Sequence, residues 1–185
     1  MSAVRSQRRR TAVESHMSTW YQFAVIDCAA DPTHLSTLHY HATTADLQTR
    51  SLFVHQPEAE HMAAAPWLVE LPLGAVHPGL DAWLAQLGRT AAGTTRLASE
   101  VPFDALFAHL EEQLDIEIPD GSLALMRFYD ARAWLRYMEV LTLTQQLELL
   151  GPILEWQVTT LGRPWTLFRE ELRKLQEAAN AATDE

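Results

Sequence analysis

The chain has 185 residues, of which 48% are hydrophobic and 21% are charged, and its formal net charge is −10. This composition suits one compact domain, or one domain with a small lobe, and it argues against disorder over most of the chain. The acid excess argues against nucleic acid and anionic membranes as partners, and no apolar run approaches the roughly 18–20 residues that span a bilayer.

The first sixteen residues differ from the rest of the chain. They hold four arginines (Arg5, Arg8, Arg9 and Arg10) and one acid (Glu14), so their +3 leaves −13 for residues 17–185. No apolar segment follows the arginines, which argues against a secretory signal, although an arginine-rich stretch can be a targeting peptide or a nucleic-acid arm. We expect residues 1–16 to be a disordered extension and the fold to begin near Met17.

A single cysteine, Cys28, excludes an internal disulfide. This fits a reducing compartment, and we expect the protein in the cytoplasm. Three histidines lie close together in the sequence at His34, His39 and His41. Two imidazoles on one face can begin a metal site, but no cysteine or close acidic pair completes one. We therefore expect exposed or hydrogen-bonded histidines and no metal.

Turn residues and apolar spacing predict alternating strands and helices in the first two thirds of the chain. Proline at both ends of residues 65–72 favours an edge strand or a strand that begins and ends abruptly. The predicted strands are Trp20–Asp27, Leu47–Val54, Ala65–Pro72 and, weakly marked, Ala92–Ser99, and the predicted helices are Pro32–Tyr40, Leu80–Leu87 and Pro102–Leu114.

The stretch Gly121–Asp130 is expected to be the central element. Its apolar residues Leu123–Met126 lie between a turn and a helix start, which is typical of a strand in an α/β domain. Arg127 and Asp130 then stand at the carboxyl end of that strand, where open α/β sheets often bind ligands. A plainer interpretation is that Asp130 caps the next helix and Arg127 pairs with a carboxylate.

The last third is predicted to be mainly helical. Helices are expected at Ala131–Met138, Thr142–Leu150 and Pro164–Ala182, with a strand at Ile153–Thr160. The long terminal helix would carry an apolar stripe, which is a candidate contact for a partner. The stripe consists of Trp165, Phe168, Leu172 and Leu175. The expected fold is therefore mixed α+β, with an α/β lobe over residues 17–130 and a helical lobe over residues 131–185 packed on it.

Recognisable catalytic motifs are absent from the sequence. It has no glycine-rich phosphate loop, no Gly-x-Ser-x-Gly elbow and no His-Glu-x-x-His helix. Asp27, Arg127 and Asp130 stand at predicted strand ends, and two carboxylates brought together can do acid–base work. A small hydrolase or transferase with a pocket around these three residues is therefore one hypothesis.

Several short motifs in a fixed order carry a resemblance to a known family. The strongest are Ala65–Leu71, Arg127–Asp130 and Gly151–Trp156. Over about residues 20–160 the chain resembles the bacterial family called domain of unknown function 4123, although Ala91–Leu97 matches its pattern poorly. The positions that match the family signature are Asp27, Pro66, Trp67, Arg127, Tyr129, Asp130 and Trp156.

The resemblance implies an adaptor chaperone of type VI secretion. Family members look like cytoplasmic proteins that bind a toxic effector and help load it onto the VgrG spike protein. This implies effector and spike as partners, no catalysis and no cofactor. The signature residues then belong to the shared core, and the effector is expected at a cleft between lobes or at an exposed apolar patch.

Overall fold

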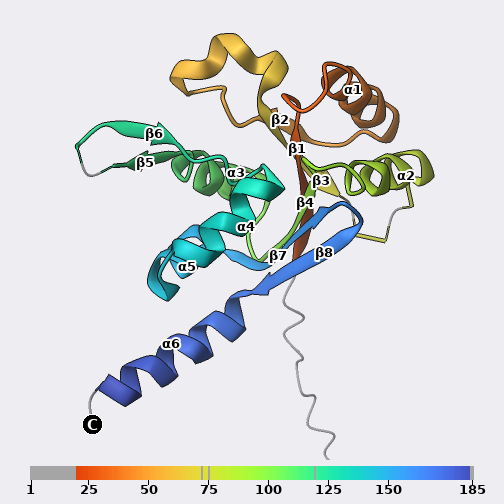
Figure 1. Cartoon of the computed structure of the whole chain (residues 1–185). Helices are drawn as coiled ribbons and strands as arrows, with labels where there is room; N and C mark the ends of the chain where they lie inside the picture. Colours follow the sequence, from red (N-terminus) through yellow and green to blue (C-terminus); the bar gives the residue numbers. More distant parts are fainter. Residues whose placement is uncertain (1–19, 72, 75, 119, 184–185) are drawn as a thin grey trace, which may run out of the picture.

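The computed structural model describes residues 20–71, 73–74, 76–118 and 120–183, and the expected extension at residues 1–16 lies outside them. Its centre is a six-stranded sheet with the order β2-β3-β1-β4-β7-β8, in which all neighbours are antiparallel (Figure 1). The strands are β1 (Tyr21–Asp27), β2 (Thr49–Ser51), β3 (Pro66–Leu71), β4 (Thr94–Ser99), β7 (Ile153–Thr160) and β8 (Arg163–Phe168).

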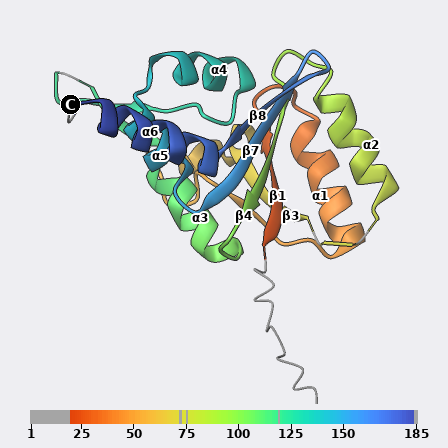
Figure 2. The same ribbon diagram turned by 90° about the horizontal axis from the view of Figure 1, so that it is seen from below.

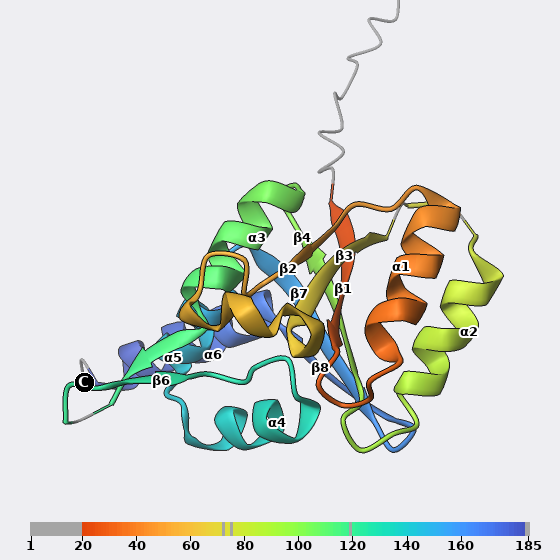
Figure 3. The same cartoon turned by 90° about the horizontal axis from the view of Figure 1, so that it is seen from above.

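Helices cover the sheet from both sides, as Figure 2 and Figure 3 show: α1 and α2 lie on one side, and α3, α4 and α5 lie on the other. A short 3₁₀ helix, η1, joins β2 to β3, and α6 ends the described chain. The helices are α1 (His34–Ala45), η1 (Pro57–Ala64), α2 (Pro78–Leu87), α3 (Phe103–Glu112), α4 (Ala131–Val140), α5 (Leu143–Leu150) and α6 (Arg169–Thr183). The expected mixed α/β class is confirmed.

Strand alternation divides the core into two layers. Phe23 of β1, Leu97 of β4 and Trp156 of β7 are lateral neighbours and pack under α3, α4 and α5. Trp134 of α4 stacks on Trp156, and Phe128 meets the Trp156 ring edge-on. On the opposite face, Ala24 and Ile26 of β1 pack against α1 and α2. Burying one such large apolar side chain contributes about 1.5–3 kcal/mol, so this layering stabilises the whole sheet.

The prediction that Leu123–Met126 is a central strand is wrong. Leu123–Leu125 forms β6, which pairs with β5 (Asp115–Glu117) in a separate two-stranded hairpin away from β1 (Figure 1 and Figure 3). Leu123 is 68% exposed, so the run is not the buried strand that its apolar sequence suggested. Because the main sheet is antiparallel, the ligand argument from parallel α/β sheets does not apply to this chain.

The prediction of one long helix over Pro164–Ala182 is also wrong at its start. Residues 163–168 form β8, and α6 begins only at Arg169. The cause is the two-residue turn Leu161-Gly162, in which φ is 50° and 73°. Two successive positive φ values match the right-handed twist of a tight hairpin, so the chain folds back on β7.

The sheet continues past the expected lobe boundary at residue 130. The expected strand at Ile153–Thr160 is confirmed as β7, and it pairs with β4 along most of its length. The buried Arg169 then fixes the start of α6, because its guanidinium donates to both oxygens of Glu100, at 2.8 and 2.7 Å, and to the carbonyl of Gly151 at 2.8 Å. Residues 131–183 are thus joined to the first part through one sheet.

We predict that alanine substitution of two tryptophans in neighbouring strands lowers the free energy of unfolding by very different amounts. Trp156→Ala empties a fully buried site and should lower the free energy of unfolding by about 3–5 kcal/mol. Trp165→Ala changes a side chain that is 51% exposed and should cost at most about 1 kcal/mol. Urea denaturation of both variants measures the difference, and equal losses would contradict the described layering.

Candidate functional site

Four charged side chains meet where β1 ends and α4 begins. Arg127 Nη2 lies 3.3 Å from Asp130 Oδ2 and 3.9 Å from Asp27 Oδ2. Arg132 Nη2 donates to Asp130 Oδ2 at 2.7 Å. The structure therefore brings Asp27, at the end of β1, close to Arg127 and Asp130, which the sequence placed at the end of another strand, and it adds Arg132. We call these four residues the charge cluster.

Asp130 holds the start of α4. Its Oδ1 accepts hydrogen bonds from the backbone N–H of Arg132 at 3.0 Å and from Arg132 Nε at 2.9 Å. The interpretation of Asp130 as a helix cap is thus confirmed, and Arg127 does pair with it. Sequence reasoning missed Arg132. The available signal was an arginine two residues after a capping aspartate, where its side chain can turn back to the carboxylate.

The two carboxylates have pKa values shifted in opposite directions. Burial alone would raise the pKa of Asp130, but the hydrogen bonds and charge of Arg132, with the charge of Arg127, outweigh it and hold that pKa below 3.8. Burial raises the pKa of Asp27 above 3.8, although its hydrogen bond from Ala29 and the charge of Arg127 oppose the shift. Asp130 is therefore a fixed anion near neutral pH, while Asp27 carries its charge at a cost.

Most of the expected signature residues lie in or against the core. Tyr129 and Trp156 are 5% and 0% exposed, and burial raises the pKa of the Tyr129 phenol to about 12. Pro66 is buried at the start of β3 opposite Asp27. Trp67 is half-buried, and its Nε1 donates to the carbonyl of Met62. These contacts give the residues packing and hydrogen-bonding roles in the fold.

Two open hollows flank Arg132. One of about 430 Å³ is lined by Asp130, Arg132, Ala133, Arg136 and Tyr137. Another of about 320 Å³ lies between Arg132 and the loops that follow β1 and α2. Because both oxygens of Asp130 are taken by Arg132, this carboxylate is poorly placed to act as a base.

Among the described residues, no group of three or more His, Cys, Asp or Glu side chains could hold a metal ion. The three histidines of α1 contact other groups: His34 Nδ1 lies 2.9 Å from the carbonyl of Asp27, His39 meets Trp67 edge-on, and His41 stacks on Trp83. Among the residues that the structure describes, no helix is long and apolar enough to cross a membrane.

Comparison with known proteins gives one match. The profile of a family described as "Domain of unknown function (DUF4123)" matches residues 22–148, which is more than half of the chain. The chain belongs to this family. No curated protein and no solved structure matches the chain. The resemblance to the DUF4123 family is thus confirmed, and the match includes every signature residue except Trp156.

The four residues of the expected partner-binding stripe do not lie on one surface of this DUF4123 protein. Trp165 and Phe168 belong to β8, where strand alternation points their side chains to opposite faces of the sheet. Leu172 is only 4% exposed, whereas Leu175 is 57% exposed. Helical spacing predicts the stripe, but the segment is strand as far as Phe168 and helix only from Arg169, so its four residues do not line up.

We predict that Asp130→Asn lowers the free energy of unfolding by about 1–3 kcal/mol at neutral pH, because it leaves two arginines without their carboxylate. Since the folded pKa of Asp130 lies below its ordinary value, this contribution is present above pH 3.8 and is lost as the pH falls through the folded pKa. Denaturant titrations between pH 2 and pH 7 should show wild type and variant converging at the acid end.

The matched control is Asp27→Asn. Because the folded pKa of Asp27 is raised, its ionisation above pH 3.8 works against stability. This variant should therefore lose less stability at neutral pH than Asp130→Asn. Equal losses would contradict the assignment of the two carboxylates. Loss of a catalytic turnover in Asp130→Asn without loss of stability would favour the hydrolase or transferase hypothesis instead.

Proposed function

We propose that this DUF4123 protein is a non-enzymatic adaptor that binds a type VI secretion effector in the cytoplasm and helps load it onto the VgrG spike. The observation that carries the proposal is the family match over residues 22–148. The adaptor role itself comes from what the resemblance to this family implies.

The character of the site supports this proposal. The charge cluster ties β1 to α4 through ion pairs, and its Asp130 is fully engaged by Arg132. The hollows beside it are open rather than enclosed, whereas small-molecule sites usually bury most of their ligand. Large apolar side chains also stand at the surface, and aromatic residues of this kind are enriched in protein interfaces. Trp20, Trp165 and Phe168 are examples, with 42%, 51% and 39% exposure.

One observation favours the second candidate, a small hydrolase or transferase. The raised pKa of the buried Asp27 carboxyl is the type of shift found in catalytic acids and bases. Structural ion-pair networks shift pKa values as well, and Asp27 already accepts a hydrogen bond from Ala29. The adaptor therefore remains the function that we propose.

We predict that the tagged chain, used as bait in its native bacterium, co-purifies with a toxin-like effector and with VgrG. Mass spectrometry of the bound fraction is the measurement. Deletion of its gene should lower secretion of that effector while other type VI cargo is still secreted, and the reintroduced gene should restore it. A folded bait that recovers neither protein, or unchanged effector secretion after deletion, would contradict the proposal.

A further inference from the structure

The main sheet buries only one of its faces along β4 and β7. In β7 the side chains of Ile153, Trp156, Val158 and Thr160 are buried, while those between them are only half-buried. The same alternation holds in β4 from Thr95 to Ser99, where Leu97 is buried and its neighbours Arg96 and Ala98 are half-buried. A sheet face that a helix covers would not show this pattern, so one side of these strands has no layer above it.

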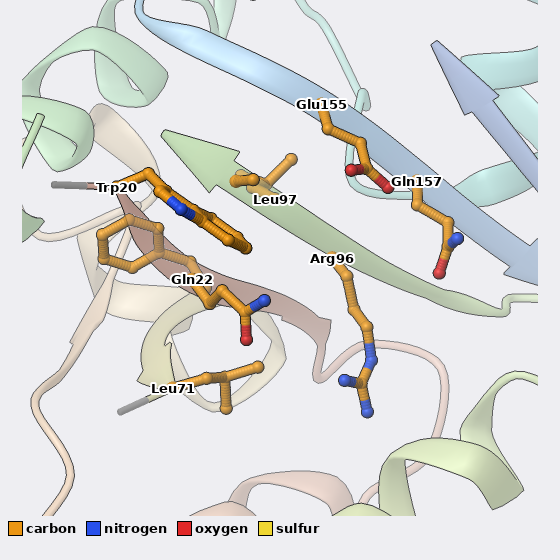
Figure 4. A pocket seen from close by; sticks show the side chains of 9 residues that line it. Trp20, Gln22, Leu71, Arg96, Leu97, Glu155 and Gln157 are labelled. Carbon is orange, nitrogen blue, oxygen red and sulfur yellow. The ribbon is translucent and has the colours of Figure 1, made fainter. Parts of the chain in front are cut away.

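Over β4 and β7, the end of α2 at Gly88 reaches only Thr94 and Thr159. The rest of the cover that α1 and α2 give to this side lies over β1 and β3. There Ala24, Ile26 and Val69 are buried against Leu38 and Leu84. Beyond them lies a hollow of about 230 Å³, shown in Figure 4, which we call the open face. We define the open face by Trp20, Gln22, Arg96, Ala98, Glu155 and Gln157.

The open face combines apolar area with unpaired charge. Trp20 is 42% exposed, and Ala98 and Leu71 add half-buried apolar surface. Figure 4 shows Arg96 and Gln157 projecting from neighbouring strands into this space. The Arg96 guanidinium has no ion pair or hydrogen bond with another described residue. A half-buried arginine without a partner is suited to bind a carboxylate, and arginine and tryptophan are both enriched at interface centres.

The width of the open face indicates what fits on it. Neighbouring strands lie about 4.8 Å apart, so β1, β4 and β7 together span about 10 Å, which is the diameter of one α-helix. The helices α1 and α2 cover the neighbouring part of the same side of the sheet, and α2 lies beside the open face (Figure 2). One further helix would complete the layer.

We propose that the open face docks an amphipathic helix of the effector, with apolar residues over Trp20 and Ala98 and a carboxylate paired with Arg96. The helix completes the layer that α1 and α2 begin. This inference rests on the proposed adaptor function and names the surface that performs it. Glu155, diagonal to Arg96 across β4 and β7, receives a basic residue of the same helix and sets its direction.

The test uses as its probe the effector that co-purifies with the chain, and calorimetry measures its affinity. Arg96→Glu should weaken binding at least about tenfold, because it replaces a buried ion pair with a repulsion. The matched control is Arg136→Glu, an equal charge reversal at an exposed residue of α4 on the other side of the sheet, which should leave the affinity within about twofold. Thermal unfolding of each variant checks that it folds.

A second measurement does not depend on the charge reversal. A photo-crosslinking residue at Gln157 should join the full chain to a helical segment of the effector, and the same residue at Arg136 should not.

The outcomes separate the two claims. If the Arg96→Glu variant binds the effector as tightly as the wild type, the proposed docking surface is wrong. The same holds if residue 136 crosslinks to the effector and residue 157 does not. Neither result contradicts the adaptor function. Crosslinks from residue 157 to VgrG instead of the effector overturn the choice of occupant. Absence of binding to both effector and spike by the folded wild type overturns the inference together with the proposed function.

Discussion

Burial of one face of the sheet is the constraint on which the rest of the structure depends. The row Phe23, Leu97 and Trp156 joins strands that are far apart in the sequence and holds them under α3, α4 and α5. Because Trp156 of this row belongs to β7, the row also fixes the position of the β7–β8 hairpin. The position of α6 follows, because Arg169 bonds to Glu100 where β4 ends. The same constraint leaves the opposite face of β4 and β7 half-covered, since α1 and α2 pack mainly on β1 and β3 and reach the other two strands only at Thr94 and Thr159.

The charge cluster acts as a second link between distant parts of the chain. Arg127 lies between two carboxylates, Asp27 at the end of β1 and Asp130 at the start of α4. Arg132 closes the arrangement by bonding to both oxygens of Asp130. Ion pairs of this kind fix geometry more than they add stability, because desolvation offsets much of the attraction. The cluster thereby sets the angle at which the chain leaves the loop after β6 and enters α4.

Local patterns in the sequence predict where strands and helices lie better than they predict which strands pair. Alternation found β1, β3 and β7, and helical spacing found α2, α3 and α5, since these signals are contained within each element. The apolar run Leu123–Met126 was assigned to the centre because such a run does not reveal which strand it pairs with. The strand β8 escapes prediction because Trp165, Phe168 and Leu172 have helical spacing, even though Gly162 indicates a turn. The approach of Asp27 to Arg127 depends on long-range pairing, which no local motif encodes.

The loading step is the centre of this account, and its most direct measurement is assembly from purified components. Light scattering coupled to size exclusion would follow the effector and VgrG with and without the chain. We predict a complex that contains effector and spike only when the folded chain is present. Equal association of effector and spike in its absence would contradict the account.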